Sequence, residues 1–300
     1  MSELNKKVQD AIKVLKMAET AASMKNPTIV NIQERSGGGQ IVDNQVEIGY
    51  SSGKDSDVIA HLAGMAGIKH VIIRKDTTVD PSYSNAHARE KGAIIIKPKQ
   101  TFFEIIRNAG FPTDQRRHCC KYLKEYKVLS TSVLGIRRCE SQSRKERYTE
   151  PTMCRIYGKK ENHVDVFLPI LEWTDEDVIE FVKQEHIKCH PLYYDEKGNF
   201  CADRRLGCYA CPLKSRKQQV ADFKKNPRFL REWIKNGIVW WNKPHTDRFK
   251  SGEKFETIYD TFYNNVFCDS YEEYLYKTRG MFGRVDVKKL LEDYFKIDLP

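Results

Sequence analysis

The segment VEIGYSSGKDSDVIAHLAG, residues 46–64, joins an apolar stretch to a turn of small residues and then to a helical pattern. Gly53 allows the backbone to come close to an oxyanion, and Lys54 supplies a positive charge. Asp55 lies at the positive end of the helix dipole, which favours a carboxylate there. Phosphate oxygens can be bound by the first N–H groups of the helix and by three hydroxyls, those of Ser51, Ser52 and Ser56. The segment therefore indicates a phosphate-binding loop, with an ordinary strand-to-helix turn and a surface lysine as the alternative.

Strand and helix patterns alternate after this segment, which is typical of an α/β fold with a mostly parallel sheet and helices on both faces. We expect strands at 46–50, 70–74, 93–97, 128–136 and 165–168, and helices at 56–67 and 82–91. A further helix is predicted to begin at Thr174, where Asp177 takes the place of the usual Glu in a helix-start box.

The two ends of the chain have patterns of their own. Residues 3–24 carry apolar side chains at helical spacing, and two short β-like stretches surround a turn signal at 36–39. From residue 215 the pattern is helical and basic to about residue 250, and two shorter helices are expected at 271–277 and 285–295. We therefore predict an N-terminal helix and hairpin, a nucleotide-binding domain and a basic helical C-terminal extension, over residues 1–45, 46–213 and 214–300.

Composition limits the class of protein. With 300 residues and 40% hydrophobic content the chain can bury a full core, so disorder is not expected. No window approaches the roughly 20 apolar residues that cross a bilayer, and the start MSELNKKVQD lacks a secretion signal, so we expect a cytoplasmic protein with no membrane partner. Nine cysteines in a reducing compartment are then available for metal binding or catalysis.

Positive charge is concentrated at residues 201–250, which hold 13 Lys and Arg against 4 Asp and Glu. This excess favours a polyanionic partner such as tRNA or DNA. Aromatic residues are interleaved with these charges, and their helical spacing fits a hydrophobic core as well as a nucleic-acid surface; they are Phe223, Phe229, Trp233, Trp240 and Trp241.

The loop SSGKDS resembles the SGGKDS loop of the PP-loop ATP pyrophosphatase superfamily, with Ser52 in place of the first glycine. Four further segments resemble, in order, motifs of the phosphoadenosine phosphosulfate (PAPS) reductase family within that superfamily; they are Asp76-Thr77, LGIRRCESQSRKER at 134–147, FLPILEWTDEDVIEFV at 167–182 and CHPLYYDEKG at 189–198. The resemblance implies the adenine nucleotide alpha-hydrolase-like fold.

The resemblance also implies a nucleotide site. Lys54 and Asp55 would be its catalytic residues, and the retained Lys54 favours ATP, accompanied by Mg²⁺, over a sulfonucleotide. The nucleotide would be bound by the loop Ser51, Ser52, Gly53, Lys54, Asp55 and Ser56, and by Asp76, Gly135, Arg137 and Arg144.

Four cysteines form two pairs, Cys119-Cys120 in QRRHCCKYLK and a C-x-x-C at Cys208 and Cys211. Four thiolates can hold zinc or a [4Fe–4S] cluster, and the adjacent pair requires a kink or a helix start. The pairs resemble those of the cluster-binding subset of the family, which implies a [4Fe–4S] cluster with zinc as the alternative. Cys201 could replace one ligand, and basic neighbours including Arg205 would offset the cluster's negative charge.

Three functions remain open. The first is ATP-dependent activation of an acceptor followed by sulfur transfer, with nucleic acid as a candidate acceptor and a protein as a candidate sulfur donor. The second is reduction of PAPS or adenosine phosphosulfate, which in the family uses a nucleophilic cysteine in a C-terminal Glu-Cys-Gly-x-x-His-type segment. This segment is not found, and Cys268, in VFCDSYEEY, has acidic neighbours. The third is a non-catalytic nucleic-acid-binding module.

Overall fold

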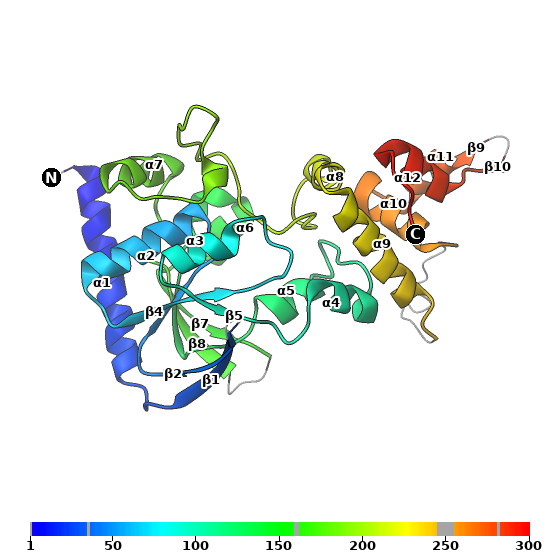
Figure 1. The fold of residues 1–300 in the computed structure, drawn as a ribbon. Helices are drawn as coiled ribbons and strands as arrows, with labels where there is room; N and C mark the ends of the chain where they lie inside the picture. The colour runs from blue at the N-terminus through cyan, green and yellow to red at the C-terminus, as the bar shows by residue number, and fades with distance from the viewer. Residues whose placement is uncertain (1, 35–36, 159–161, 245–254, 281–282) are drawn as a thin grey trace. The chain divides into compact units, whose positions relative to one another are not determined.

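A computed structural model describes residues 2–34, 37–158, 162–244, 255–280 and 283–300. The chain divides into two compact units (Figure 1). Unit 1 consists of Met1–Asp76, Asp80–Pro98 and Lys124–Gly207. Unit 2 consists of Thr77–Val79, Lys99–Leu123 and Cys208–Pro300. These units differ from the three predicted segments. Residues 99–123 were predicted to be part of the nucleotide-binding domain, whereas the structure groups them in unit 2 with the C-terminal helices.

Unit 1 contains an eight-stranded sheet with the order β2-β1-β5-β4-β3-β6-β8-β7. The strands are β1 (Ile29–Glu34), β2 (Gly37–Val42), β3 (Val46–Gly49), β4 (His70–Lys75), β5 (Ile94–Ile96), β6 (Thr131–Leu134), β7 (Thr152–Ile156) and β8 (His163–Phe167). The five strands from β5 to β8 in this order pair in parallel, and β2, β1 and β7 add antiparallel strands at the edges. The predicted mostly parallel α/β sheet is confirmed.

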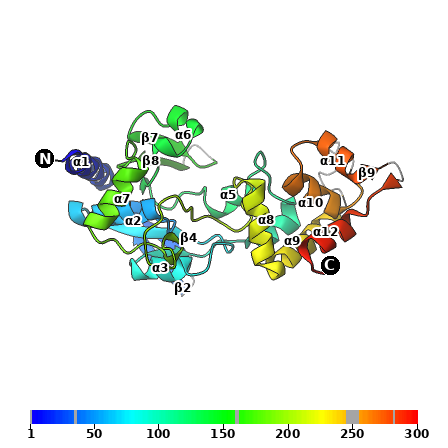
Figure 2. The same ribbon diagram turned by 90° about the horizontal axis from the view of Figure 1, so that it is seen from above.

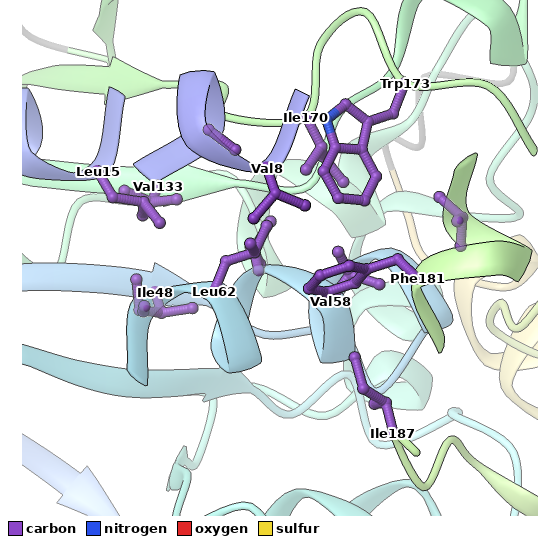
Figure 3. Packing of buried hydrophobic residues seen from close by; sticks show 14 of the residues in the cluster. Val8, Leu15, Ile48, Val58, Leu62, Val133, Ile170, Trp173, Phe181 and Ile187 are labelled. Carbon is purple, nitrogen blue, oxygen red and sulfur yellow. The ribbon is translucent and has the colours of Figure 1, made fainter. Parts of the chain in front are cut away.

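The described helices of unit 1 are α1 (Glu3–Ser23), α2 (Lys54–Ala66), α3 (Ser84–Glu90), α6 (Gln142–Arg147) and α7 (Asp175–Gln184). Helices α1, α2 and α7 share one hydrophobic core with the central strands, as Figure 3 shows for Val8, Val58 and Phe181. Helix α1 buries one side of its surface, formed by Leu4, Val8, Ala11, Leu15, Ala18 and Ala22. The N-terminal helix is therefore part of the core of unit 1.

The order of strands in the sheet reverses between β3 and β6. From β3 the chain continues to β4 and β5 on one side of the sheet, and then returns to place β6 and β8 on the other side of β3. In open α/β sheets such a reversal leaves a crevice at the carboxyl ends of the two strands, where ligands bind. The loop that follows β3 is residues 50–53, so the predicted phosphate loop lies at this crevice.

Unit 2 is helical in its described part (Figure 2). Its helices are α4 (Phe102–Ala109), α5 (His118–Leu123), α8 (Arg216–Lys225), α9 (Pro227–Trp241), α10 (Ile258–Phe267), α11 (Tyr271–Thr278) and α12 (Val287–Phe295), with a small hairpin of β9 (Arg279–Gly280) and β10 (Gly283–Arg284). Four of the aromatic residues interleaved with the basic residues are buried in its core, namely Phe223, Phe229, Trp233 and Trp240. These four aromatics are core residues, so they provide no exposed surface for stacking bases.

Local sequence signals are confirmed at several places and wrong at one. Thr174 caps α7, since its Oγ1 accepts from the N–H of Asp177 at 3.2 Å while its own N–H donates to the Asp177 carboxylate at 2.7 Å. Gly37, Gly38 and Gly39 lie in β2 and not in a turn, because they pair with residues of β1. Ser36 of that predicted turn, and the end of the basic helix after residue 244, lie outside the described residues. No helix in the described ranges is long and apolar enough to span a bilayer.

We predict that Leu15→Ala destabilises unit 1 by roughly 2–5 kcal/mol, because it leaves a cavity at a fully buried position of α1. Met17→Ala is the matched control, since this side chain is 52% exposed and its loss costs about 0.5 kcal/mol or less. Denaturant unfolding of both variants measures the difference, and equal stabilities would contradict the packing of α1 described above.

Candidate functional site

A cavity of about 340 Å³ lies in unit 1 at the carboxyl ends of β3 and β6. One wall is the loop and first turn of α2, with Ser51, Gly53, Lys54, Asp55 and Ser56. The opposite walls come from the end of β6 and from later segments, with Gly135, Glu140, Arg144, Tyr193 and Arg205 among the residues that line them. The cavity therefore joins the predicted phosphate loop to two of the other residues predicted to bind the nucleotide, Gly135 and Arg144.

Gly53 is the N-cap residue of α2 and gives the helix no side-chain cap. The N–H of Lys54 donates to the Tyr193 hydroxyl, whereas no N-cap side chain satisfies the other N–H groups of the first helical turn, which can donate to an anion. The two flanking hydroxyls are close together, since Ser51 Oγ and Ser56 Oγ are 3.3 Å apart. A helix N-terminus without an N-cap side chain, with two hydroxyls beside it, is a suitable place for an anion.

Ser52 has a left-handed backbone conformation with φ of 64°. A non-glycine residue rarely adopts this conformation, which explains why glycine suits this position of the loop. The Ser52 side chain is fully buried, and its Oγ donates to the carbonyl of Ser84 in α3 at 2.7 Å. Ser52 is therefore an anchor that ties the loop to α3, and it does not line the cavity.

Lys54 and Arg137 lie in one network of charges with two carboxylates. The Arg137 side chain is 1% exposed; its Nε donates to Asp55 at 2.7 Å and its Nη2 to Asp175 at 2.8 Å. Burial lowers the pKa of Arg137, but the two carboxylates outweigh burial and the pKa is raised above its ordinary value. Lys54 is also buried, with Nζ 3.6 Å from Asp55 and 4.0 Å from Asp175. Arg137 thus orients Asp55, and it is not among the residues that line the cavity.

Gly135 follows β6 directly and lies against the first turn of α2. A Cβ at this position would be 3.0 Å from the carbonyl oxygen of Asp55 and 3.1 Å from its carbonyl carbon. Only glycine allows the end of β6 to approach α2 this closely. The role of Gly135 is therefore to let the two walls of the cavity meet.

Two arginines line the opposite side of the cavity. Arg144 pairs with Glu140, and burial lowers the pKa of this guanidinium from its ordinary value, although it remains a cation at neutral pH. Arg205 Nη2 donates to the carbonyl of Glu140 at 3.2 Å. The sequence associated Arg205 with the cysteines, whereas the structure places it in the wall of the cavity beside the first turn of α2.

Tyr193 is a lining residue that the sequence singled out only as part of the CHPLYYDEKG resemblance. Burial raises its pKa to about 12, and its ring centroid is 5.8 Å from Lys54 Nζ.

Asp76, by contrast, is buried at the end of β4, where its N–H donates to the carbonyl of Ile96 at 3.1 Å. Asp76 is not among the residues that line this cavity.

Below the loop lies a buried polar group that the sequence did not indicate. The Tyr50 hydroxyl donates to Asp57 in the first turn of α2, and His87 Nε2 of α3 is 2.9 Å from the same carboxylate. All three side chains are nearly inaccessible to solvent. The contacts of Tyr50 and His87 with Asp57, together with the hydrogen bond from Ser52 to Ser84, connect the loop and the residues on either side of it to α3.

All four paired cysteines belong to unit 2. Cys119 and Cys120 lie in the first turn of α5, which confirms the expected helix start. Contact with the Cys120 thiol and then burial raise the pKa of Cys119, with further contributions from the charges of Cys120 and Cys211. Cys208 Sγ is 3.6 Å from Thr77 Oγ1. The two pairs are thus carried by two segments of one unit.

The donor set suits a soft metal centre, because several thiols lie close enough to affect one another. Within the described residues no three His, Cys, Asp or Glu side chains are arranged to hold a metal ion, so the thiols do not form a complete ligand set. Cys201 belongs to unit 1, and its thiol donates to the carbonyl of Asn199 at 3.6 Å. The structure therefore groups the four paired cysteines in one unit without Cys201.

We predict that Gly135→Ala weakens the binding of ATP by roughly 10- to 100-fold, because the added Cβ must displace either β6 or the first turn of α2. Gly64→Ala is the control: its Cβ meets open space in the interior of α2, and alanine there stabilises the helix by about 0.5–1 kcal/mol. Calorimetric titration with ATP measures both variants. Unchanged affinity in Gly135→Ala would mean that ATP does not bind between these two walls.

Three comparisons place the chain among known proteins. The structure resembles that of the U34-tRNA thiolase NcsA from Methanococcus maripaludis with its [4Fe-4S] cluster, at a TM-score of 0.39 and 12% identity over 84% of this chain and 82% of that one. At this TM-score the likeness carries no argument about function.

The chain is also 31% identical over 147 residues to an uncharacterized 37.8 kDa protein from the gpa 5′ region of Escherichia phage 186. The match covers 44% of this chain and 41% of that protein, so the chain spans less than half the length of this relative. Residues 45–214 match the phosphoadenosine phosphosulfate reductase domain. Because this match covers more than half of the chain and contains the whole cavity described above, the protein belongs to the phosphoadenosine phosphosulfate reductase domain family.

Proposed function

We propose that the protein is an ATP-using sulfurtransferase, which activates an acceptor oxygen at the α-phosphate of ATP and then replaces that oxygen with sulfur. The observation that carries this proposal is the N-terminus of α2, which has no side-chain cap and places the buried cation Lys54 at the wall of the cavity. Helix N–H groups together with a lysine suit a polyphosphate better than a single sulfate, because they can neutralise charge on several phosphoryl groups.

In the first step an acceptor oxygen attacks the α-phosphorus of ATP, the bond from this phosphorus to the bridging oxygen breaks, and pyrophosphate leaves. In the second step sulfur at the sulfide oxidation level attacks the acceptor carbon, the carbon–oxygen bond breaks, and AMP leaves with the oxygen. The two steps involve no net oxidation or reduction. Mg²⁺ bound to ATP would neutralise part of the charge on the leaving pyrophosphate.

The residues of the cavity have separate roles in this reaction. Lys54 neutralises the charge that develops on pyrophosphate, and Asp55, which Arg137 orients, holds the position of Lys54. Arg144 and Arg205 face the same cavity and stabilise the remaining phosphate oxygens. Ser52 and Asp57 hold the loop in place through their contacts with α3, so Lys54 and Asp55 need little reorganisation during the reaction.

Cys119, Cys120, Cys208 and Cys211 would hold a [4Fe–4S] cluster, with zinc as the alternative metal. When bound, such a cluster would supply a site that holds the incoming sulfur. Four paired cysteines in one unit support this assignment, because their thiols become thiolate ligands when they bind such a cluster.

Reduction of a sulfonucleotide is the second candidate, because the family takes its name from that reaction. It requires a reactive thiol besides the four paired cysteines. Cys268 is 2% exposed, and burial raises its pKa to about 11, so it is a protonated thiol at neutral pH. These properties favour sulfur transfer over reduction.

A nucleic acid is the acceptor class that the charge of unit 2 favours. Unit 2 contains 23 Lys and Arg against 15 Asp and Glu. Six basic side chains are exposed on two consecutive helices, α8 and α9; they are Lys217, Lys224, Lys225, Arg228, Arg231 and Lys235. Basic side chains of this kind bind phosphates of a nucleic-acid backbone.

We predict that the chain releases pyrophosphate from ATP in the presence of its acceptor, and that Lys54→Ala lowers the rate by roughly 100-fold or more. Lys97→Ala, at an exposed lysine of the same unit, should leave the rate unchanged. Pyrophosphate release with tRNA or DNA, measured beside sulfite release from PAPS and adenosine phosphosulfate, tests the assignment. Sulfite release without ATP consumption would favour the reductase.

A second prediction concerns the cysteines. Anaerobically purified protein should contain iron and sulfide and absorb near about 400 nm, and Cys211→Ala should lose most of both. Cys154→Ala is the control, because Cys154 is exposed in the edge strand β7. A colourless protein that contains zinc would contradict the iron–sulfur assignment and leave the nucleotide chemistry untouched.

A further inference from the structure

Tyr193 lines the cavity beside α2, and the proposed reaction gives it no role. It is the last residue of a short 3₁₀ helix, Pro191–Tyr193, and its side chain is buried. Its carbonyl accepts from the N–H of Cys201 at 2.7 Å, and its ring packs against that of Phe200 with the centroids 5.9 Å apart. These contacts fix the position of the phenol group.

The hydroxyl of Tyr193 lies at the start of α2. Its oxygen accepts from the N–H of Lys54, the first residue of that helix, and from the N–H of Leu206 at 3.4 Å. A Cβ on Gly53 would be 3.5 Å from this oxygen and 3.2 Å from Ser51 Oγ. Because Gly53 has no side chain, the space next to both hydroxyls stays open.

The hydrogen of this hydroxyl is not used within the protein. A phenol oxygen can accept hydrogen bonds from N–H groups while its own O–H donates another. The two backbone N–H groups use the oxygen as an acceptor, and no group in the described ranges accepts from the Tyr193 O–H. Burial raises the pKa of Tyr193 to about 12, so the hydrogen is retained at neutral pH. A ligand oxygen in the cavity would give this donor its acceptor.

The charges of the cavity favour an anionic oxygen as that acceptor. The lining cations are Lys54, Arg144 and Arg205, and the lining carboxylates are Asp55 and Glu140. Both carboxylates are already paired with arginine side chains. Phosphate oxygens are strong acceptors, and a helix N-terminus attracts them. Since the Tyr193 hydroxyl lies beside the first residue of α2, it can reach the same phosphates as the helix N–H groups.

We propose that Tyr193 binds the polyphosphate of ATP by donating its O–H to an oxygen of the β- or γ-phosphate. The inference rests on the proposed use of ATP, and it adds a phosphate ligand from outside the loop at 51–56. As charge develops on the leaving pyrophosphate, this hydrogen bond becomes stronger, so Tyr193 also stabilises the transition state.

Calorimetric titration of the full chain with ATP, pyrophosphate and AMP tests the proposal. Tyr193→Phe removes the hydroxyl and keeps the ring. It should weaken the binding of ATP and of pyrophosphate roughly 10- to 100-fold, the range for a hydrogen bond to a charged group, and leave the affinity for AMP unchanged. An equal loss for AMP would overturn the assignment to the β- or γ-phosphate.

Tyr194→Phe is the matched control. The Tyr194 hydroxyl also accepts from a backbone N–H, that of Cys189 at 3.1 Å, but Tyr194 is not among the residues that line the cavity. This variant should bind all three ligands as the unmodified chain does. A loss of ATP affinity that is equal in Tyr193→Phe and Tyr194→Phe would overturn the proposal, because it would reflect a general loss of structure.

The direction of the change separates a phosphate ligand from a structural acceptor. Both variants leave a backbone N–H without its acceptor, so both should have a lower melting temperature. If the Tyr193 hydroxyl served only as an acceptor for Lys54, its removal would free that N–H for a phosphate. ATP and pyrophosphate would then bind Tyr193→Phe as tightly as the unmodified chain or more tightly, and this result would overturn the proposal.

If Tyr193→Phe does not fold, crystals of the unmodified chain with a non-hydrolysable ATP analogue answer the same question. Tyr193 Oη should lie within about 3 Å of an oxygen of the β- or γ-phosphate. A separation of more than about 3.5 Å from all of these oxygens would overturn the proposal.

The role of Tyr193 and the proposed function fail separately. Loss of ATP affinity in Tyr193→Phe, without pyrophosphate release in the presence of tRNA or DNA, would remove the proposed function only. Pyrophosphate release together with equal ATP affinity in Tyr193→Phe and the unmodified chain would remove the role of Tyr193 only.

Discussion

The arrangement of charges at the cavity depends on the contact between Arg137 and Asp55 at the N-terminus of α2. The first turn of this helix presents N–H groups without a side-chain cap and contains Lys54, so positive charge is concentrated at the end of β3. Buried cations are costly unless carboxylates accompany them. Asp55 and Asp175 meet this requirement, and because Arg137 holds both of them, Lys54 remains positioned at the wall of the cavity.

The loop is kept rigid by bonds that lie away from the cavity. Ser52 is held in a left-handed conformation by its bond to Ser84, and His87 contacts Asp57 in the first turn of α2. Helix α3 therefore holds the loop in place through these two contacts. Preorganised groups of this kind stabilise developing charge without moving, which is the largest contribution to many phosphoryl and nucleotidyl transfers.

Much of this arrangement could be predicted from the sequence, because it depends on local signals. The loop at 51–56 lies between a strand and a helix, and Thr174 caps α7 as expected. The roles of Arg137, Arg205 and His87 could not be predicted, since each depends on a partner distant in the sequence. Edge strand β7 was missed because its residues alternate between exposed and half-buried without a clear apolar face. The aromatics of α8 and α9 fitted two interpretations, and only packing distinguishes them.

The central claim is that the N-terminus of α2 binds the phosphates of ATP. A crystal structure of the chain with a non-hydrolysable ATP analogue and Mg²⁺ tests it most directly. We expect the β- and γ-phosphates to accept hydrogen bonds from the N–H groups at the start of α2, with Lys54 Nζ within hydrogen-bond distance of a phosphate oxygen. Phosphates bound away from α2, with the contacts of Lys54 unchanged, would contradict it.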